Sequence, residues 1–429
     1  MSGRSCKHHA YAGTIMRKVM TRAEFCKILV AGSLMGRSNG VAAESGRDAT
    51  RIAVDDGLKQ LNDVFWLPEI ANWIDRPQKD LRAVFEGRMN PPWWSCANVV
   101  EGMIDWMNRT STTSYDAQIR EIYEGNVIRG GRYQMLANSM QKNGDWKDQD
   151  QQVLARKKSE VQNPRVNASQ FRNEYLDDSG WWALAWLAFY ERTREPKYLR
   201  TAIAIHKHMA SGWRQDGGIS WALEPDKRGA NAITNSLFVV LSARLNRLTK
   251  NQEYLDWAKK TLDWEKQVKL YDGVGIVDRP GHRGDYWTYN QGVYLGGLDA
   301  MHEATGEIKY LEEAALVVKS MIEKSGIVTS EKILLEKLST EGWDVGMFKG
   351  ICARYWGLLA RSLRSAKIRM DVADQIEEVL RASHEAVLAL PQQQGIYPLE
   401  WQRDARAEVV NFNTHASAIL LLMAEPPQA

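Results

Sequence analysis

Long hydrophobic runs are missing from this sequence of 429 residues, although 44% of its residues are hydrophobic. No apolar stretch reaches the roughly 18 residues that a helix needs to cross a bilayer, so we expect no transmembrane segment. An excess of one charge is missing too. The 56 basic and 53 acidic residues leave a net charge of +3, which gives no general attraction to nucleic acid or to an anionic membrane. These absences favour a soluble globular protein without a nucleic-acid partner.

Cysteine is scarce, with four residues at positions Cys6, Cys26, Cys96 and Cys352. Their spacing fits neither a metal site nor a disulfide framework. A bridge between Cys96 and Cys352 would require an early and a late helix to be neighbours, and we expect two separate buried thiols instead. The glycine-rich stretches lack the strand and helix that flank a nucleotide-binding loop. The sequence therefore predicts no metal and no cofactor.

Phenylalanine is also scarce, whereas tryptophan is common: the chain has 8 Phe and 17 Trp. Indole rings stack on the apolar faces of sugars, so this excess suits a protein that binds carbohydrate. The signal is weak, because most of these indoles are expected to belong to the core.

Residues 1–45 differ from the rest of the chain. Several basic residues precede a modest apolar stretch over residues 25–35, and the small-residue pattern Val41-Ala42-Ala43 follows. This order is typical of an export signal with cleavage after Ala43. We therefore predict a leader that is removed, a secreted, periplasmic or cell-surface protein, and a single domain over residues 50–429. If the leader is not a signal, it is a disordered tail and the protein is cytoplasmic.

The remaining chain is organised around residues 175–186, YLDDSGWWALAW, where the adjacent acids Asp177 and Asp178 are followed by the adjacent indoles of Trp181 and Trp182. Asp, Ser and Gly begin helices, so both carboxylates are expected at a helix N-terminus, where backbone donors favour negative charge. Paired acids beside an aromatic wall suit glycoside cleavage, because one acid attacks the sugar and the other protonates the leaving oxygen. Taken alone, however, such a run is usually only a helix cap.

An internal repeat runs through the chain. Thr110, Thr193, Thr249 and Thr305 are each followed five residues later by Tyr, and the last two intervals are 56 residues each (249 − 193 and 305 − 249). Each Thr should close an apolar helix and each Tyr should open an amphipathic one. The pattern predicts apolar helices over residues 104–108, 182–192, 233–247 and 292–304, and amphipathic helices over residues 115–123, 198–209, 254–268 and 310–322.

Further helices are expected over residues 55–67, 351–362 and 373–390, and from Asn413 onward. Pro68 should break the first of them or open a short second helix. A helix that is apolar all round is buried, and a half-charged helix faces water. The sequence therefore predicts an all-α fold of about six helical hairpins, arranged as an open solenoid or as a closed double ring.

The turns that lead from each amphipathic helix to the next apolar helix are long and rich in functional groups. Residues 216–231, 272–292 and 340–350 gather Trp, Tyr, Asn, Gln and Asp, and the Asp177–Asp178 pair precedes an apolar helix in the same way. Function normally lies on such loops when a rigid scaffold holds them. Residues 138–173 are charged and Gln-rich, and we expect an exposed insertion or lid there, beside the same face.

Five motifs occur in a fixed order: residues 92–98 (PWWSCAN), 175–185 (YLDDSGWWALA), 217–219 (GGI), 231–235 (NAITN) and 287–292 (WTYNQG). In order and spacing, over roughly residues 60–425, they resemble glycoside hydrolase family 76, the endo-α-1,6-mannanases. The resemblance implies an (α/α)6 barrel and retaining, internal cleavage of α-1,6-linked mannan by double displacement. It also implies that Asp177 is the nucleophile and Asp178 the general acid and base. Two positions depart from the family: Ser220, where an aromatic residue is frequent, and Ala230, where a Lys is frequent.

Aromatic and polar residues near the acid pair are candidates for binding the sugar. The candidates for stacking are Trp93, Trp94, Trp181, Trp221, Trp287, Tyr289 and Trp343, and those for hydrogen bonds to sugar hydroxyls are Asn98, Asp216, Asn231, Asn290 and Gln291. The alternative for each is a role in core packing or loop structure. For Trp182 and Trp186 we expect core packing. We expect His206 and His208 to be solvated on an outer helix and His415 to be structural.

Several functions remain open on the sequence alone. The leading hypothesis is an exported, monomeric endo-acting hydrolase whose partner is an α-mannan polysaccharide or oligosaccharide. A mannan transglycosylase would use the same covalent intermediate, and products formed with an added acceptor would distinguish it. A non-catalytic mannan-binding helical barrel is disfavoured by the intact acid pair. A helical scaffold for protein partners is disfavoured because Trp, Asn and Asp gather on one set of turns.

Overall fold

The computed structural model describes residues 39–68, 71–77, 92–125, 171–227, 229–336, 344–390, 395–402 and 410–424. The chain divides into two compact units, residues 1–51 with 428–429 and residues 52–427. The first unit contains the start of helix α2 (Asn39–Phe65). Residues 1–38 of the predicted leader lie outside the described residues, as does most of the predicted insertion over residues 138–173, so both stay predictions.

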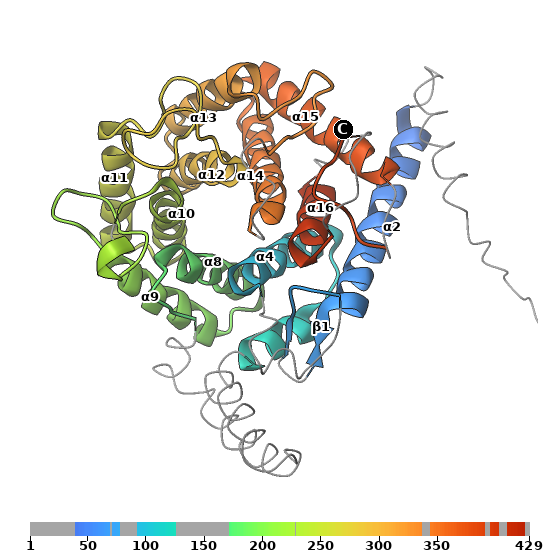
Figure 1. The fold of residues 1–429 in the computed structure, drawn as a ribbon, viewed down its shortest axis with the longest axis horizontal. Helices are drawn as coiled ribbons and strands as arrows, with labels where there is room; N and C mark the ends of the chain where they lie inside the picture. Colours follow the sequence, from blue (N-terminus) through green and yellow to red (C-terminus); the bar gives the residue numbers. More distant parts are fainter. Residues whose placement is uncertain are drawn as a thin grey trace, which may run out of the picture. The chain divides into compact units, whose positions relative to one another are not determined.

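Among the described residues of the second unit, six helices form an inner ring. They are α4 (Trp93–Thr110), α8 (Leu176–Thr193), α10 (Ala232–Thr249), α12 (Thr288–Thr305), α14 (Val345–Ala366) and α16 (Phe412–Ala424). Each helix contacts the next in this order and α16 contacts α4, so the ring is closed (Figure 1). Of the two arrangements that the repeat allowed, the structure is therefore the closed double ring.

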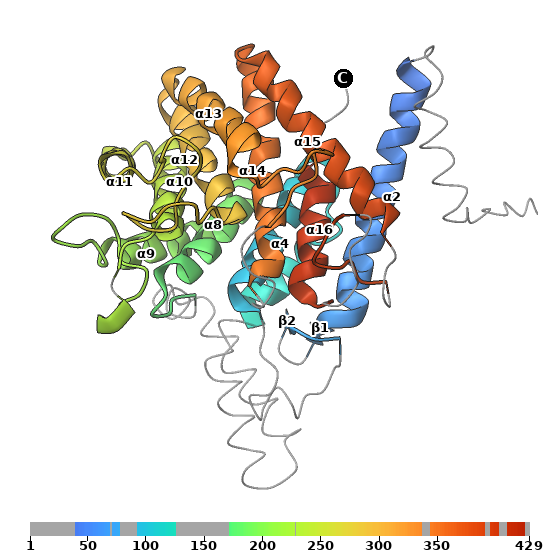
Figure 2. The ribbon, with the colours of Figure 1, turned by 45° about the horizontal axis from the view of Figure 1, so that its top comes forward.

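The outer helices alternate with the inner ones along the chain. They are residues 116–125, α9 (Pro196–Ala210), α11 (Gln252–Gln267), α13 (Lys309–Ser320) with its π-helical continuation η3 (Met321–Ser325), and α15 (Met370–Ala389). In both views α13 and α15 lie outside α12 and α14 (Figure 1, Figure 2). Residues 52–65 of α2 pack against α16, where the backbone carbonyl of Gly57 lies 3.0 Å from Nε2 of His415. The predicted all-α (α/α)6 barrel is confirmed.

The repeated threonine has a physical role at the end of each inner helix. The hydroxyl groups of Thr110, Thr193, Thr249 and Thr305 each donate to the carbonyl oxygen four residues earlier, at 2.7–2.8 Å. The residue after each Thr takes the left-handed conformation that ends a helix. The same short turn is thus built four times, and the described long loops over residues 211–227 and 268–287 lie at the opposite end of these helices.

Some local expectations are corrected by the structure. Pro68 follows the two-residue strand β1 (Trp66–Leu67), which pairs antiparallel with β2 (Asn72–Trp73), so the alternative of a short second helix is wrong. His206 is only 2% exposed and lies 2.9 Å from the hydroxyl of Ser242, so it is not solvated. Burial lowers the pKa of His206 to about 3. The outer helix α9 thus buries His206 against α10.

Other expectations about the core are confirmed. Cys96 and Cys352 are buried free thiols. His415 is fully buried, accepts a hydrogen bond from the backbone N–H of Tyr397 at Nδ1, and is structural. Trp182 and Trp186 are fully buried and stack on each other with ring centroids 5.4 Å apart.

Candidate active site at the open end of the barrel

The acid pair lies in the first turn of α8. Tyr175 precedes the helix in an extended conformation and pairs with Ala222 in an antiparallel bridge. The backbone N–H of Leu176 donates to the carbonyl oxygen of Trp221 at 2.9 Å. This pairing fixes where the helix starts, so the half-buried carboxylates of Asp177 and Asp178 lie at a helix N-terminus, as predicted.

Each carboxylate accepts a hydrogen bond from a different loop. Oδ2 of Asp177 accepts from the indole Nε1 of Trp221 at 3.0 Å, and Oδ2 of Asp178 accepts from Nδ2 of Asn173 at 2.8 Å. Within the described part of the chain, Oδ1 of Asp177 is buried and accepts no hydrogen bond. One oxygen of this carboxylate is therefore held in place while the other keeps its lone pairs free.

Burial raises the pKa of both acids. The pKa of Asp177 lies well above its ordinary value because the group is buried and Asp178 is next to it. The pKa of Asp178 rises to about 7, first through burial and then through the charges of Asp344 and Glu174, against the hydrogen bond from Asn173. Two interacting acids of this kind hold one proton near neutral pH, and the apparent pKa values describe the pair and not either acid alone.

Aromatic rings from four inner helices form a wall beside the acids. Trp94 of α4 stacks on Trp181 of α8 at 6.0 Å between ring centroids and lies 6.2 Å from Phe348 of α14. Phe348 in turn stacks on Tyr289 of α12 at 3.9 Å and meets Trp287 edge-on at 5.6 Å. The ring closure thus joins four predicted stacking residues into one continuous surface.

The remaining predicted aromatic residues differ in their surroundings. Trp221 is 37% exposed and packs against the ring of Tyr175 at 5.2 Å. Trp93 is half-buried and packs against Trp182 at 6.0 Å, behind the wall. Trp343 lies outside the described residues, so its role stays a prediction.

Further carboxylates surround the site. Asp344, just before α14, accepts from the indole Nε1 of Trp94 at 2.9 Å. Burial and the charges of Asp278, Asp177, Asp344 and Glu336, in that order, raise the pKa of Tyr289 well above its ordinary value. The Tyr289 hydroxyl is therefore a proton donor rather than a phenolate at this end of the barrel.

The predicted polar residues divide into two groups. Asn231 caps α10 by accepting from the backbone N–H of Thr234 at 3.2 Å, and the amide of Asn98 donates to the carbonyl oxygen of Trp94 at 3.2 Å. Gln291 is fully buried, and its amide bonds both the N–H and the carbonyl oxygen of Ile276. These three side chains are occupied with helix and loop structure.

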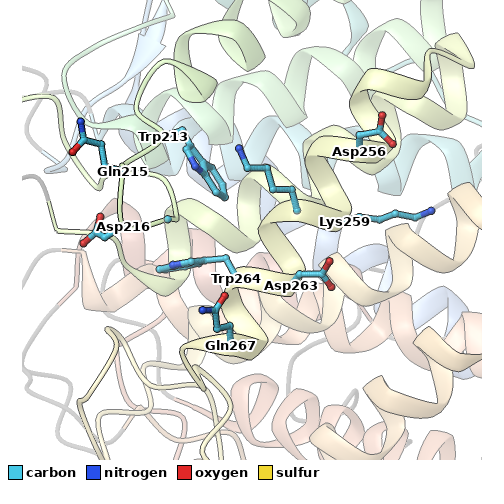
Figure 3. Close-up of a pocket in the computed structure, with 10 residues that line it drawn as sticks. Trp213, Gln215, Asp216, Asp256, Lys259, Asp263, Trp264 and Gln267 are labelled. Atoms are coloured by element: carbon cyan, nitrogen blue, oxygen red, sulfur yellow. The ribbon is translucent and has the colours of Figure 1, made fainter.

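Asn290 and Asp216 lie in different surroundings. Asn290 is fully buried and donates to Asp278 at 3.2 Å, and its Oδ1 has no hydrogen-bond partner among the described residues. Asp216 is exposed and forms an ion pair with Arg214 at 2.7 Å. It lines a separate hollow on the outer wall and not the acid pair (Figure 3).

Three residues of the site were missed by the sequence reasoning: Phe348, Asp344 and Asn173. Phe348 and Asp344 lie in residues 340–350, a turn that the sequence predicted to carry functional groups. Their neighbours in sequence did not distinguish these two residues from the others in that turn. Asn173 lies four residues before Asp177, at the end of residues 138–173, for which the sequence predicted an exposed insertion. The departures Ser220 and Ala230 face each other in an antiparallel bridge, so two small residues stand opposite one another next to Trp221.

The described residues contain no group of three or more His, Cys, Asp or Glu side chains placed to hold a metal ion. None of the helices in the described ranges combines the length and the apolar character that crossing a membrane requires.

Comparison with known families decides the class of this site. A model described as glycosyl hydrolase family 76 matches residues 77–426, which contain both acids and the whole inner ring. The chain belongs to glycosyl hydrolase family 76. It is thereby classed among the glycoside hydrolases, as the sequence motifs predicted.

The family includes curated relatives with partial matches. The chain is 30% identical over 225 residues to the mannan endo-1,6-alpha-mannosidase DCW1 of Saccharomyces cerevisiae, covering 46% of this chain and 49% of that protein. It is 27% identical over 295 residues to the mannan endo-1,6-alpha-mannosidase DFG5 of Candida albicans, covering 61% and 63%. The match thus spans about half the length of DCW1 and somewhat more of DFG5.

Solved structures share the fold. An inactive variant of the alpha-1,6-mannanase of Salegentibacter sp. HEL1_6, in complex with alpha-1,6-mannotriose, superposes with a TM-score of 0.66 at 22% identity. The superposition covers 87% of this chain and 97% of that one. Dfg5 of Chaetomium thermophilum, in complex with glucosamine, has a TM-score of 0.58 at 21% identity and covers 79% and 81%.

Proposed function

We propose that this chain hydrolyses α-1,6-linked mannan internally, with retention of the anomeric configuration. Asp177 acts as the nucleophile and Asp178 as the general acid and base. The observation that carries the proposal is the pair of adjacent carboxyl groups in the first turn of α8, where the pKa of Asp178 is raised to about 7 beside Asp177. Retaining hydrolysis needs such a pair, one ionised and one protonated.

The hydrogen bonds favour this division of roles. The N–H of Trp221 and the backbone donors of the first turn of α8 stabilise the ionised form of Asp177. Asp178 faces the negative charges of Asp344 and Glu174, which disfavour its ionised form. Burial also raises the pKa of Asp177. We propose that its donors offset this effect, so that a single proton on the pair lies on Asp178, which donates it to the leaving oxygen.

The reaction then proceeds in two balanced steps. The carboxylate of Asp177 attacks the anomeric carbon, the glycosidic C–O bond breaks, and the leaving oxygen takes the proton of Asp178. The resulting Asp178 carboxylate removes a proton from water, whose oxygen attacks the same carbon and releases Asp177. The half-buried rings of Trp94, Trp287 and Tyr289 supply apolar surface for the sugar rings, and the buried rings of Trp181 and Phe348 pack against them.

The relatives support the choice of substrate. Two curated relatives are named mannan endo-1,6-alpha-mannosidases. The bacterial mannanase that shares the fold binds alpha-1,6-mannotriose, and its inactive form was made by replacing two consecutive aspartates. Asp177 and Asp178 are two consecutive aspartates at the mouth of the same type of barrel, which supports their assignment here.

Incubation of the full chain with linear α-1,6-mannan tests this function, with products read by mass and anomeric configuration. We expect short oligosaccharides with retained α-configuration. Asp177→Asn and Asp178→Asn should each reduce turnover to background while leaving the helical circular dichroism spectrum unchanged. Normal turnover by either variant would sink the assignment, and inverted products would exclude the covalent intermediate.

Interception by another sugar is the main alternative outcome. A transglycosylase would transfer the glycosyl group of Asp177 to an added acceptor faster than to water, and its products would lengthen rather than shorten. Binding of mannan without any product would instead indicate a non-catalytic barrel. The same assay with and without acceptor therefore separates the three possibilities.

The export of the chain and its monomeric state stay proposals. N-terminal sequencing of protein recovered outside producing cells should begin at Glu44 if the leader is cleaved after Ala43. Light scattering of that protein should give the mass of one chain.

A further inference from the structure

A shallow hollow of about 590 Å³ lies on the outer wall of the barrel, away from the acid pair. Its walls are the loop that follows α9 and the exposed side of α11, and Figure 3 shows Trp213 and Trp264 near its centre, with Lys259 and Gln215 pointing outward. Neither Asp177 nor Asp178 lines it.

Two indoles form the aromatic part of the hollow. Trp264 packs under the backbone of Gly217 and Gly218, where an added Cβ would lie 2.5 Å from the ring at either glycine. Trp213 meets Trp257 edge-on at 5.5 Å, and the ammonium of Lys260 lies 4.0 Å from the Trp213 ring centroid. Both indoles are therefore fixed in orientation. Trp264 is 7% exposed and forms the floor, whereas Trp213 is half-buried and presents ring surface whose fixed orientation lowers the entropic cost of binding a ligand.

Polar groups at the rim are available to a ligand. Asp263 and Gln267 are exposed, and within the described ranges neither side chain makes a hydrogen bond to another residue. The charges are mixed, because Asp256 and Asp263 face Lys259 and Lys260, and Asp216 is already paired with Arg214. Balanced charge beside fixed indoles suits a neutral ligand with many hydroxyl groups better than an anion or a cation.

The hollow and the acid pair share one loop. The segment that covers Trp264 with Gly217 continues to Trp221, whose indole donates to Asp177. Four residues of extended chain separate these two positions by at most about 14 Å. A mannan chain that occupies the acid site could therefore extend to the hollow.

We propose that the hollow between Trp213 and Trp264 is a second carbohydrate site, which holds a distant part of the α-mannan chain. The choice of mannan rests on the proposed function. Binding at two sites on one polymer raises the local concentration of substrate at the acids without changing the chemistry.

The test is native electrophoresis of the full chain in gels that contain soluble α-1,6-mannan, with Asp178→Asn as the background so that the polymer persists. In this background we expect D263A/Q267A and, separately, Trp213→Ala to weaken retardation by at least about fivefold. Glu253→Ala is the matched control, because Glu253 is an exposed acid on the same helix that does not line the hollow. Its retardation should equal that of the background.

The outcomes separate this inference from the proposed function. Hydrolysis by the parent chain reports on the acid pair, whereas the difference between the hollow variants and the Glu253→Ala control reports on the hollow. Retardation that is equal in D263A/Q267A, Trp213→Ala and the control would overturn the inference, even if the parent hydrolyses mannan. Absence of any retardation of the parent would overturn it as well. A loss confined to the hollow variants, with unchanged thermal midpoints, would support it.

Discussion

At the residue scale, Asp344 connects the aromatic wall to the acids. Its carboxylate accepts from the indole of Trp94, and its charge contributes to the raised pKa of Asp178. Asparagine at this position can still accept that hydrogen bond but carries no charge, so Asp344→Asn separates the two effects.

The pH profile of kcat/KM should reveal the charge of Asp344. The active form needs Asp178 protonated, so activity falls as the pH rises through its pKa of about 7. Removal of a nearby negative charge lowers that pKa, and the alkaline limb of Asp344→Asn should move to lower pH. Asp371→Asn, at an exposed carboxylate on α15, should leave the limb in place. An unmoved limb in Asp344→Asn would contradict the role of this charge.

Trp221 acts on the other acid. Trp221→Phe keeps an aromatic ring but removes the N–H that donates to Asp177. A hydrogen bond to a charged group contributes about 1.5–3 kcal/mol, so kcat should fall by roughly 10- to 100-fold. Because the ionised form of Asp177 loses a donor, its pKa rises and the acid limb should move to higher pH. The pH profiles of kcat/KM for Trp221→Phe and for the parent chain measure this shift. An unchanged acid limb in Trp221→Phe would argue that Asp177 is not the ionised group.

At the element scale, close packing of the inner helices depends on glycine. An added Cβ at Gly292 of α12 would lie 2.7 Å from the Cα of Cys352, in the backbone of α14. At Gly297 the nearest atom is a side-chain carbon of Val239 at 3.2 Å, which can move. The two glycines therefore differ in what a methyl group meets, although both stand on the same helix.

The pair Gly292→Ala and Gly297→Ala tests how rigid the ring is. Gly292→Ala should lower the free energy of unfolding by about 1–3 kcal/mol, because two backbones must separate. Gly297→Ala should change it little, because the helix propensity gained, about 1 kcal/mol, offsets a small repacking. Thermal unfolding of both variants measures the difference, and equal midpoints would show that α12 and α14 can move apart freely.

The element scale also explains why Gln291 looked functional. Asn235 of α10 and Gln291 of α12 occupy equivalent positions, 56 residues apart (291 − 235), and each amide bonds both the N–H and the carbonyl oxygen of one isoleucine in the preceding loop. From sequence alone, an amide in a loop with many polar and aromatic residues is predicted to bind a ligand. Here it fixes the loops that carry the site.

At the scale of the whole molecule, a buried charge network joins the inner helices near the middle of the ring. Glu101 of α4 is 1% exposed and pairs with Arg244 of α10 at 2.7 Å and with Arg354 of α14 at 3.0 Å. Arg244 also pairs with Glu191 of α8 at 3.2 Å. Helices that are far apart in sequence are thereby held across the axis of the barrel.

Loss of the central charge should destabilise the ring. Glu101→Gln leaves two buried guanidinium groups short of a charge partner, and we expect a loss of about 3 kcal/mol in the free energy of unfolding. The exposed pair Lys59–Asp63 is the control, where Lys59→Ala should cost less than about 1 kcal/mol. Urea unfolding of both variants gives the two values, and a Glu101→Gln midpoint as high as that of the control would mean that the network contributes no net stability.

The sequence by itself determined the features that depend on neighbours along the chain. Apolar and charged helices alternate in the periodicity of their residues, and the threonine that ends each inner helix bonds a carbonyl only four residues away. The acids lie in the first turn of a helix as these local rules predicted, although the pairing of Tyr175 with Ala222 fixes where α8 starts. These features were predicted correctly because their causes lie within one helical turn.

Only the tertiary structure decided what surrounds the acids. Trp94 meets Asp344 across 250 positions of the chain, and Trp221 reaches Asp177 across 44. His206 became buried and Asp216 turned to the outer wall through the packing of helices that sequence spacing does not specify. Closure of the ring brings these residues together, and the pKa values of the acids follow from the burial and charge that closure creates.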